Sequence, residues 1–493
     1  MERRVMGEEW ETAILEIPKK TSTVLFSSKQ YQEAFFECLP EGLYGKNVPA
    51  APRLYLTNGG VIYVDTGNHV EYGTPEGSTP AAVVIYAKNG EAIISEMVSK
   101  ANKHPEFQNA GLTLAAFKNN TSQNGESYGT HENYLVRRND HTKPDYELLW
   151  RIGWFLGARM AFTGNGLFGI NKKGKIRFTL SQRIHFMRYG VGKNTTAERG
   201  IIDVRDEPFA DENKYRRLHI IAGDATIFQA ATHLKFGMTD LVLDALEEGY
   251  IRHFPFGKFS DEEIIGGLRE YAADPSLRLT YQRLTVIDRL ERYFEIVSAY
   301  YQKFGNLTPE RKKILEIWEK GIAAARSGNP AHALSRIAGW AAKLTFVRND
   351  AVRRKYDWND PSHEISIPIR RGGECINEDK RTVFFHAKSL DYQFDRIYPR
   401  GIALLLEEKG YTDTIATAED IARVRTRPIP GDTRADARAQ ELAWIFAVSE
   451  GSPLKNFSAD WTHIIAQFPA GDGVWISHKD PFDATPFPHS KPE

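Results

Sequence analysis

Carboxylates recur on two segments whose alternating pattern is typical of β-strands. In "GVIYVD", residues 60–65, Tyr63 and Asp65 project to one side, because successive side chains of a strand point to opposite faces. The same alternation places Glu9 and Glu11 on one face of "RRVMGEEWETAIL". If these strands are neighbours in one sheet, the three carboxylates share a surface and Glu71 lies close behind. Such oxygen ligands are typical of Mg²⁺ or Mn²⁺ sites, and the alternative is a solvent-exposed sheet face with ordinary charges.

A second set of polar residues lies in "RGIIDVRDEPFADENKYRRLHIIAGD", residues 199–224, which ends in a predicted strand containing His219. Its arginines, interspersed with carboxylates, are Arg199, Arg205, Arg216 and Arg217. Arginine forks match phosphate oxygens, and nearby carboxylates suit the metal ion that accompanies a nucleotide. The segment therefore suggests a metal-nucleotide site on a sheet. The alternatives are structural ion pairs for the arginines and a core position for His219.

Composition and missing motifs narrow the class of protein. The sequence has no Gly-Lys-Ser/Thr phosphate loop and no dinucleotide fingerprint, so neither a P-loop nor a Rossmann site is expected. Basic and acidic residues both number 64, and this balance favours neither a nucleic acid polymer nor a membrane as partner. Two distant cysteines, no apolar signal region and no apolar run of about 18 residues predict a soluble, cytoplasmic protein.

The elements that must position these residues form a strand-rich first half followed by helices. Asn58-Gly59 between two apolar runs predicts a tight hairpin. Strands are predicted at 3–15, 54–57, 60–65, 81–87, 111–118, 131–138 and 216–225. Helices are predicted at 28–38, 238–250, 281–305 and 308–328, the last with Thr308 as N-cap and Pro309 at the first helical position. Strands followed by helices indicate an α+β fold, and residues 425–440 look like a linker.

Several long motifs resemble those of the Pup ligases and their relatives the depupylases. They occur in order over nearly the whole chain: "RRVMGEEWE", "LTNGGVIYVDTGNHVEYGTPE", "KNNTSQNGESYGTHENYL", "LSQR", "RGIIDVRDEPFADENKYRRLHIIAGDA", "LDYQFDRI", "DTRADARAQEL", "ADWTHI" and "KDPF". The resemblance implies a glutamine-synthetase-like domain over residues 1–425, with a curved antiparallel sheet backed by helices. It also implies a small C-terminal domain, 426–493, that closes against the nucleotide site.

The resemblance also implies an activity. In that family a concave sheet binds ATP and Mg²⁺, the γ-phosphoryl group passes to the terminal glutamate of the small modifier protein Pup, and a protein lysine attacks the resulting acyl phosphate. Carried over by motif, the metal ligands are Glu9, Tyr63 and Glu71, the catalytic base is Asp65, and the nucleotide contacts are Thr74 and Trp461. By analogy with the fold, His219 is a further metal ligand and Arg205 a phosphate partner.

Departures from the family pattern keep alternatives open. The family usually has an ATP-contacting arginine where Val61 stands, and Phe209 replaces the histidine of its "NTRDEPHAD" motif. Such changes suit a phosphotransferase that acts on a small-molecule hydroxyl, such as that of a nucleoside, in place of a Pup-like modifier and lysine. A depupylase is the third reading. The short interval before "LTNGG", which lacks a depupylase-like inserted loop, favours the ligase.

Overall fold

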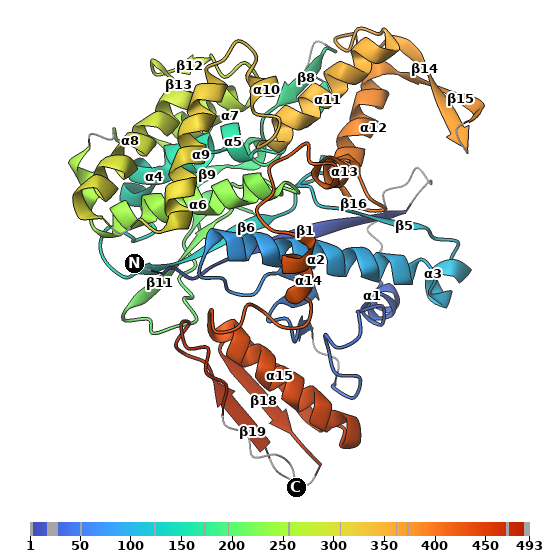
Figure 1. Ribbon diagram of the computed structural model, residues 1–493, viewed down its shortest axis with the longest axis vertical. Coiled ribbons are helices and arrows are strands. Elements are labelled where there is room, and N and C mark those ends of the chain that lie inside the picture. Colours follow the sequence, from blue (N-terminus) through green and yellow to red (C-terminus); the bar gives the residue numbers. More distant parts are fainter. Residues whose placement is uncertain are drawn as a thin grey trace.

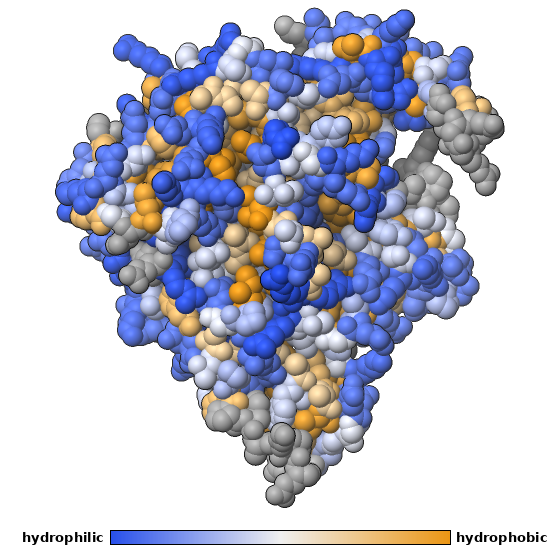
Figure 2. Space-filling model, viewed as in Figure 1, coloured by the Kyte–Doolittle hydropathy of each residue, from blue (hydrophilic) through white to orange (hydrophobic). Residues whose placement is uncertain are grey.

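A computed structural model describes residues 3–16, 28–49, 52–122, 125–170, 174–195, 197–254, 257–305, 307–360, 362–371, 374–469 and 473–487 of the 493-residue chain. Within these ranges the predicted α+β fold is confirmed, with one large sheet, helices packed on it, and a separate small sheet near the C-terminus (Figure 1). Most of the surface shown in Figure 2 is hydrophilic, with hydrophobic residues in small patches. None of the described helices has the length and apolar composition needed to cross a bilayer.

The large sheet contains ten strands among the described residues. In spatial order its main path is β2 (Arg53–Tyr55), β3 (Val61–Val64), β4 (Val70–Gly73), β1 (Met6–Glu16), β6 (Thr130–Arg137), β11 (Tyr215–Ile220), β10 (Gly200–Asp203) and β9 (Tyr189–Gly192). Off this path, β5 (Leu114–Phe117) pairs with β1 and with β16 (Arg396–Tyr398). The pairs are antiparallel except β9 with β10. The predicted hairpin is confirmed: β2 and β3 are joined through Asn58 and Gly59, and Gly59 has a φ of 83°.

One face of the sheet is covered by helices. Trp10 and Tyr72 pack against α2 (Pro80–Ala101) at Gly90, where a Cβ would lie 2.4 Å from the Trp10 ring, so only glycine allows this approach. Beyond β6, the apolar residues of β6 and β11 pack with α4 (Tyr146–Ala158) and α6 (Gln229–Glu247). Further helices complete this layer: α5 (Met160–Thr163), α7 (Asp261–Ala272), α8 (Val286–Phe304), α9 (Pro309–Ala325), α10 (Pro330–Ala333) and α11 (Gly339–Arg354).

The remaining elements lie around this core. They are α1 (Lys29–Phe36), α3 (Pro105–Asn109), α12 (Val383–Phe394), α13 (Ile402–Glu408), α14 (Ala418–Arg423) and the hairpins β7 (Leu167–Ile170) with β8 (Ile176–Thr179), β12 (Thr280–Tyr281) with β13 (Leu284–Thr285), and β14 (Glu364–Arg371) with β15 (Glu374–Thr382). The C-terminal part consists of α15 (Arg434–Gly451) and a three-stranded sheet of β17 (Asn456–Ala459), β18 (His463–Gln467) and β19 (Gly473–Ser477). In Figure 1 it projects from the lower end of the molecule.

Three local predictions need correction. Residues 81–87 are helical, not a strand, because Thr79 caps α2 and Pro80 occupies its first turn. The helix predicted from residue 238 begins nine residues earlier, at Gln229. The predicted linker ends early, because α15 begins at Arg434 with Thr433 as its N-cap. Thr308 caps α9 with Pro309 in its first turn, as predicted. The domain boundary at residue 425 stays a prediction.

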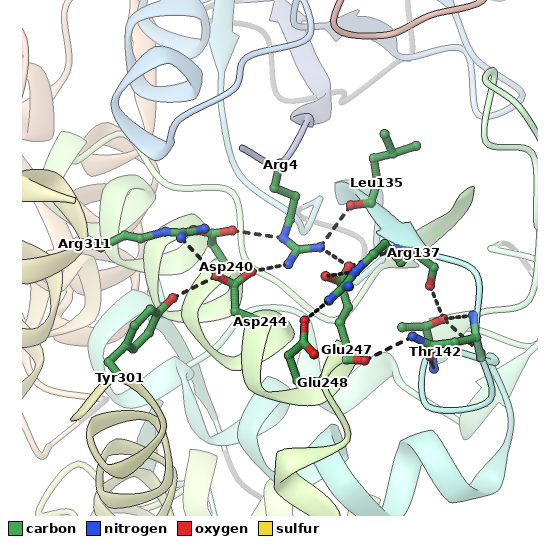
Figure 3. Close-up of polar contacts among 11 residues, drawn as sticks. Arg4, Leu135, Arg137, Thr142, Asp240, Asp244, Glu247, Glu248, Tyr301 and Arg311 are labelled. Carbon is green, nitrogen blue, oxygen red and sulfur yellow. Dashed lines mark hydrogen bonds and ion pairs between the residues drawn. The ribbon is translucent and has the colours of Figure 1, made fainter. Parts of the chain in front are cut away.

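A buried ion-pair cluster ties the start of the chain to the helical layer (Figure 3). The Arg4 guanidinium is fully buried and pairs with Asp240 at 2.9 Å, Asp244 at 2.7 Å and Glu247 at 2.6 Å, all on α6. Arg311 of α9 pairs with the same two aspartates. Although burial lowers the pKa of Arg4, the three carboxylates raise it well above its usual value, so the charge is retained. Arg4 thus anchors the segment that leads into β1.

Replacing Arg4 with methionine should destabilise the fold by about 3–5 kcal/mol, because three buried carboxylates lose the guanidinium that they share. The measurement is the free energy of unfolding in urea, with Arg400→Met as matched control. Arg400 forms one exposed ion pair, with Glu408 at 2.9 Å, so its loss should cost at most about 1 kcal/mol. Equal effects of the two substitutions would contradict an anchoring role for Arg4.

Candidate active site

The face of the sheet opposite α2 carries two rows of functional side chains. Residues paired directly across an antiparallel sheet point to the same face, so each row runs across the strands. The first row is Tyr55, Val61, Gly73, Glu9 and His131, on β2, β3, β4, β1 and β6. The second row is Arg53, Tyr63, Glu71 and Glu11, on β2, β3, β4 and β1. The structure therefore brings the predicted metal ligands Glu9, Tyr63 and Glu71 onto one surface.

Glu9, His131 and His219 form a cluster in which one potential ligand atom from each lies within 4.8 Å of the others. His131 Nδ1 is 3.5 Å from a Glu9 oxygen, and the two imidazole centroids are 5.0 Å apart. Burial raises the pKa of Glu9, but the His131 hydrogen bond and the charge of His219 outweigh it and lower the pKa to about 2. Among the described residues, neither ring nitrogen of buried His219 has a hydrogen-bond partner. These donors fit a divalent cation.

His219 is suited to metal binding in its neutral form. Burial, followed by the charges of His131 and Arg217, lowers its pKa well below the usual value. A neutral imidazole offers a lone pair to a cation, whereas a protonated one does not. The structure thus brings His219 next to Glu9, while its metal-binding role stays a prediction.

The second row concentrates negative charge beside this cluster. Burial and the charges of Glu9, Glu11 and Asp65 raise the pKa of Glu71 well above its usual value. Burial and the charges of Glu9 and Glu71 also raise the pKa of the Tyr63 phenol. Carboxylates that repel one another in this way gain stability when a cation binds between them. The chemistry of the donor set therefore fits Mg²⁺ or Mn²⁺ better than a thiol-seeking metal.

Asp65 lies at the end of β3, in a turn where its carbonyl accepts the Asn68 amide at 2.8 Å. Its side chain is half-buried, and its charge acts on Glu71. Nearby, His69 contacts Glu11, with Nδ1 3.3 Å from a carboxylate oxygen, and stacks on Tyr128 at a centroid distance of 4.5 Å. Asp65 is thus at the edge of the carboxylate surface, partly open to an incoming group.

Thr74 and Trp461 line one pocket together with Glu9 and Arg217. The Thr74 hydroxyl accepts the backbone amide of Glu8 at 3.0 Å, which fixes the loop after β4 against β1. Trp461 comes from the C-terminal part, just before β18. This arrangement agrees with the predicted pair of nucleotide contacts. Their role in nucleotide binding stays a prediction.

The charge of Arg205 acts on His219, and its role as a phosphate partner stays a prediction. Its side chain is exposed, and it is not among the residues that line the Thr74 and Trp461 pocket. Two arginines line this pocket: Arg434, which pairs with Glu76, and Arg217, whose Nη1 lies 3.4 Å from the Asn133 amide oxygen and whose guanidinium lies 5.8 Å from the Phe209 ring centroid. Arg217 is therefore a further candidate for a phosphate partner.

Glu76 connects the C-terminal part to the pocket through ion pairs. Arg438 and Arg434 of α15 pair with its carboxylate at 2.6 and 2.9 Å. Burial raises the pKa of Glu76, but these two arginines lower it to about 2, so Glu76 stays ionised. Arg438 also donates to the Trp461 carbonyl at 2.9 Å, and its guanidinium lies 5.0 Å from the Trp461 ring centroid. Glu76 thus holds Trp461 at the pocket.

Sequence reasoning gave no individual role to His131 or Arg217, which it had only as members of polar segments, and gave none to Glu76. The alternation of "HENYL" puts His131 and Asn133 on one face of a strand, and this signal can be read from the sequence alone. Which face is the site face depends on the register of β6 with β1, in which His131 lies opposite Glu9. Register is a tertiary property that the strand pattern alone does not contain.

Residues 9–366 match the sequence pattern of the family described as Pup-ligase protein. The chain belongs to the Pup ligase family. Two relatives illustrate its range. A depupylase of Acidothermus cellulolyticus is 34% identical over 433 residues, which cover 86% of this chain and 76% of the relative. A Pup-protein ligase of Acidimicrobium ferrooxidans is 32% identical over 436 residues, which cover 87% of each chain.

Solved structures agree with membership of the Pup ligase family at the level of the fold. The ligase PafA in its complex with Pup has a TM-score of 0.77 at 24% identity, over 98% of this chain and 89% of that chain. PafA in complex with ADP has a TM-score of 0.72 at 24% identity, over 96% and 94%. The expected glutamine-synthetase-like fold of the Pup ligase family is therefore confirmed.

Replacing His219 with alanine should weaken Mn²⁺ binding at least about tenfold, because one ligand of the Glu9 cluster is lost. Isothermal titration of Mn²⁺ into the protein measures this, with exposed His253→Ala as the control. Unchanged Mn²⁺ affinity in the His219 variant would remove this residue from the metal site.

Proposed function

We propose that this chain is an ATP-dependent carboxylate-amine ligase that joins the terminal glutamate of a Pup-like modifier to a protein lysine. The supporting observation is that Glu9, Tyr63 and Glu71 share one face of the sheet, here called the wall, beside the pocket lined by Thr74 and Trp461. Two relatives add support, since one is named a Pup-protein ligase and PafA has been solved with Pup and with ADP.

The wall of Glu9, Tyr63 and Glu71 accounts for the first half of the proposed reaction, the transfer of the phosphoryl group to the modifier. Glu9, Tyr63 and Glu71 would hold Mg²⁺, with His131 and His219 beside Glu9. When bound, Mg²⁺ neutralises charge on the phosphate oxygens. Thr74 and Trp461 would orient the nucleotide, and Arg217 in the same pocket would contact its phosphates. An oxygen of the side-chain carboxylate of the modifier's terminal glutamate then bonds to the γ-phosphorus as the bond to ADP breaks.

Asp65 accounts for the second half. A lysine ammonium must lose a proton before its nitrogen can attack the activated carbonyl carbon. Asp65 lies at the end of β3, half-buried and beside the carboxylate wall, where it can take that proton. The amide forms as phosphate leaves. This role follows the family motif and the position of Asp65 at the edge of the site.

Asp65→Asn should reduce turnover by at least about 100-fold, because the substituted amide cannot accept the lysine proton. Binding of Mg-ATP, measured by isothermal titration, should change less than about twofold, since Asp65 is assigned no contact with the nucleotide. Exposed Asp140→Asn is the matched control. Full turnover by the Asp65 variant would exclude it as the base.

The acceptor is tested directly with γ-labelled ATP, a Pup-type peptide ending in glutamate, and a lysine-bearing protein. The ligase proposal predicts an isopeptide between peptide and protein, with label released as phosphate. Label stably attached to a small molecule from a metabolite pool would instead identify a phosphotransferase. Cleavage of a pre-formed conjugate without net ligation would identify a depupylase.

A further inference from the structure

Arg53 lies on the edge strand β2 and extends the second row of the site by one residue. It is paired in register with Tyr63, so both side chains point to the same face. Its guanidinium stacks over the Tyr63 ring, 4.2 Å from the centroid. A cation held in this way has a restricted orientation and keeps its N–H groups free for another partner. Arg53 is thus held in one orientation beside the wall of Glu9, Tyr63 and Glu71.

The charge of Arg53 is directed toward the site, yet no described residue forms an ion pair or hydrogen bond with its side chain. Burial lowers its pKa, but the neighbouring Tyr63, Tyr55, Glu9 and Glu71 outweigh it and raise the pKa. The residue is nevertheless exposed. An exposed, permanently charged arginine facing a carboxylate wall has donors available for a ligand anion.

Val61 in the neighbouring row supplies no such charge. It is 1% exposed and belongs to an apolar cluster with Leu442 and Ile445 of α15. Its Cγ1 lies 2.9 Å from where a Cβ on Gly73 would stand, with the Trp461 ring also close to that point. Val61 therefore packs against the C-terminal part, and the cation available on this side of the wall comes from β2.

We propose that Arg53 binds the terminal phosphate of a nucleoside triphosphate lying on the Glu9, Tyr63 and Glu71 wall. This inference rests on the nucleotide site of the proposed function but not on the identity of the acceptor. The planar guanidinium offers paired N–H donors that match two phosphate oxygens. A diphosphate, which lacks the terminal group, would not use this contact. Arg53 thereby distinguishes the triphosphate from the diphosphate.

The test compares two nucleotides by isothermal titration in the presence of Mg²⁺: a non-hydrolysable β,γ-imido ATP analogue and ADP. Arg53→Gln should weaken binding of the analogue at least about tenfold, because charged hydrogen bonds are lost, and leave ADP affinity within about twofold. Arg53→Lys should give an intermediate loss, since it keeps the charge without the fork. Arg423→Gln, on an exposed part of α14, is the control and should change neither affinity.

Two results would overturn the proposal. Unchanged affinity for the analogue in Arg53→Gln would show that the terminal phosphate does not contact this residue. Equal losses for the analogue and ADP would show that Arg53 acts only by supporting Tyr63. The thermal midpoint of each variant checks folding, which an exposed residue with one ring contact should barely affect. The nucleotide titration contains no acceptor. Its result therefore does not depend on whether the ligase assay detects an isopeptide.

Discussion

The register of β1 is the constraint on which the site depends. Neighbouring glutamates of this strand face opposite sides of the sheet, so a slip of one residue would exchange them. Glu8 faces the helices, where its buried carboxylate is 2.6 Å from Lys235 and 3.3 Å from Lys118. Burial raises the pKa of Glu8, but the two lysines outweigh it and lower the pKa. This pairing fixes Glu9 on the opposite face, the face of the site.

With β1 in this register, adjacent strands bring residues from distant parts of the chain to Glu9. The ladder with β4 places Gly73 opposite Glu9, and the ladder with β6 places His131 on the other side. His219 reaches the same point from β11. The backing helices hold the sheet in place, since Arg4 ties the start of β1 to α6 (Figure 3). The charged wall thus depends on a rigid, buried opposite face.

Local sequence patterns predicted which side chains of one strand share a face. Alternation correctly placed Glu9 and Glu11 on one face of their strand, because strand geometry depends only on neighbouring residues. That Tyr63 shares this face depended on strand pairing, which β4 provides by lying between β1 and β3. The position of His131 beside Glu9 was not predicted, since only the pairing of β6 with β1 places it there. Residues 81–87 were assigned wrongly because their Val-Val-Ile run favours strands, whereas the cap at Thr79 and Pro80 starts a helix.

Val61 and Arg53 show why the C-terminal part and the electrostatics of the wall must be considered together. The site-facing residues Tyr55, Val61 and Tyr63 also belong to the apolar cluster on which α15 and its small sheet pack. An arginine at Val61 would bring a charged group into that contact, with a desolvation cost that valine avoids. Arg53, on the exposed edge strand, keeps its charged group accessible to solvent while facing the same row. The sheet can therefore bind the C-terminal part through apolar contacts and still place the guanidinium of Arg53 beside its carboxylates.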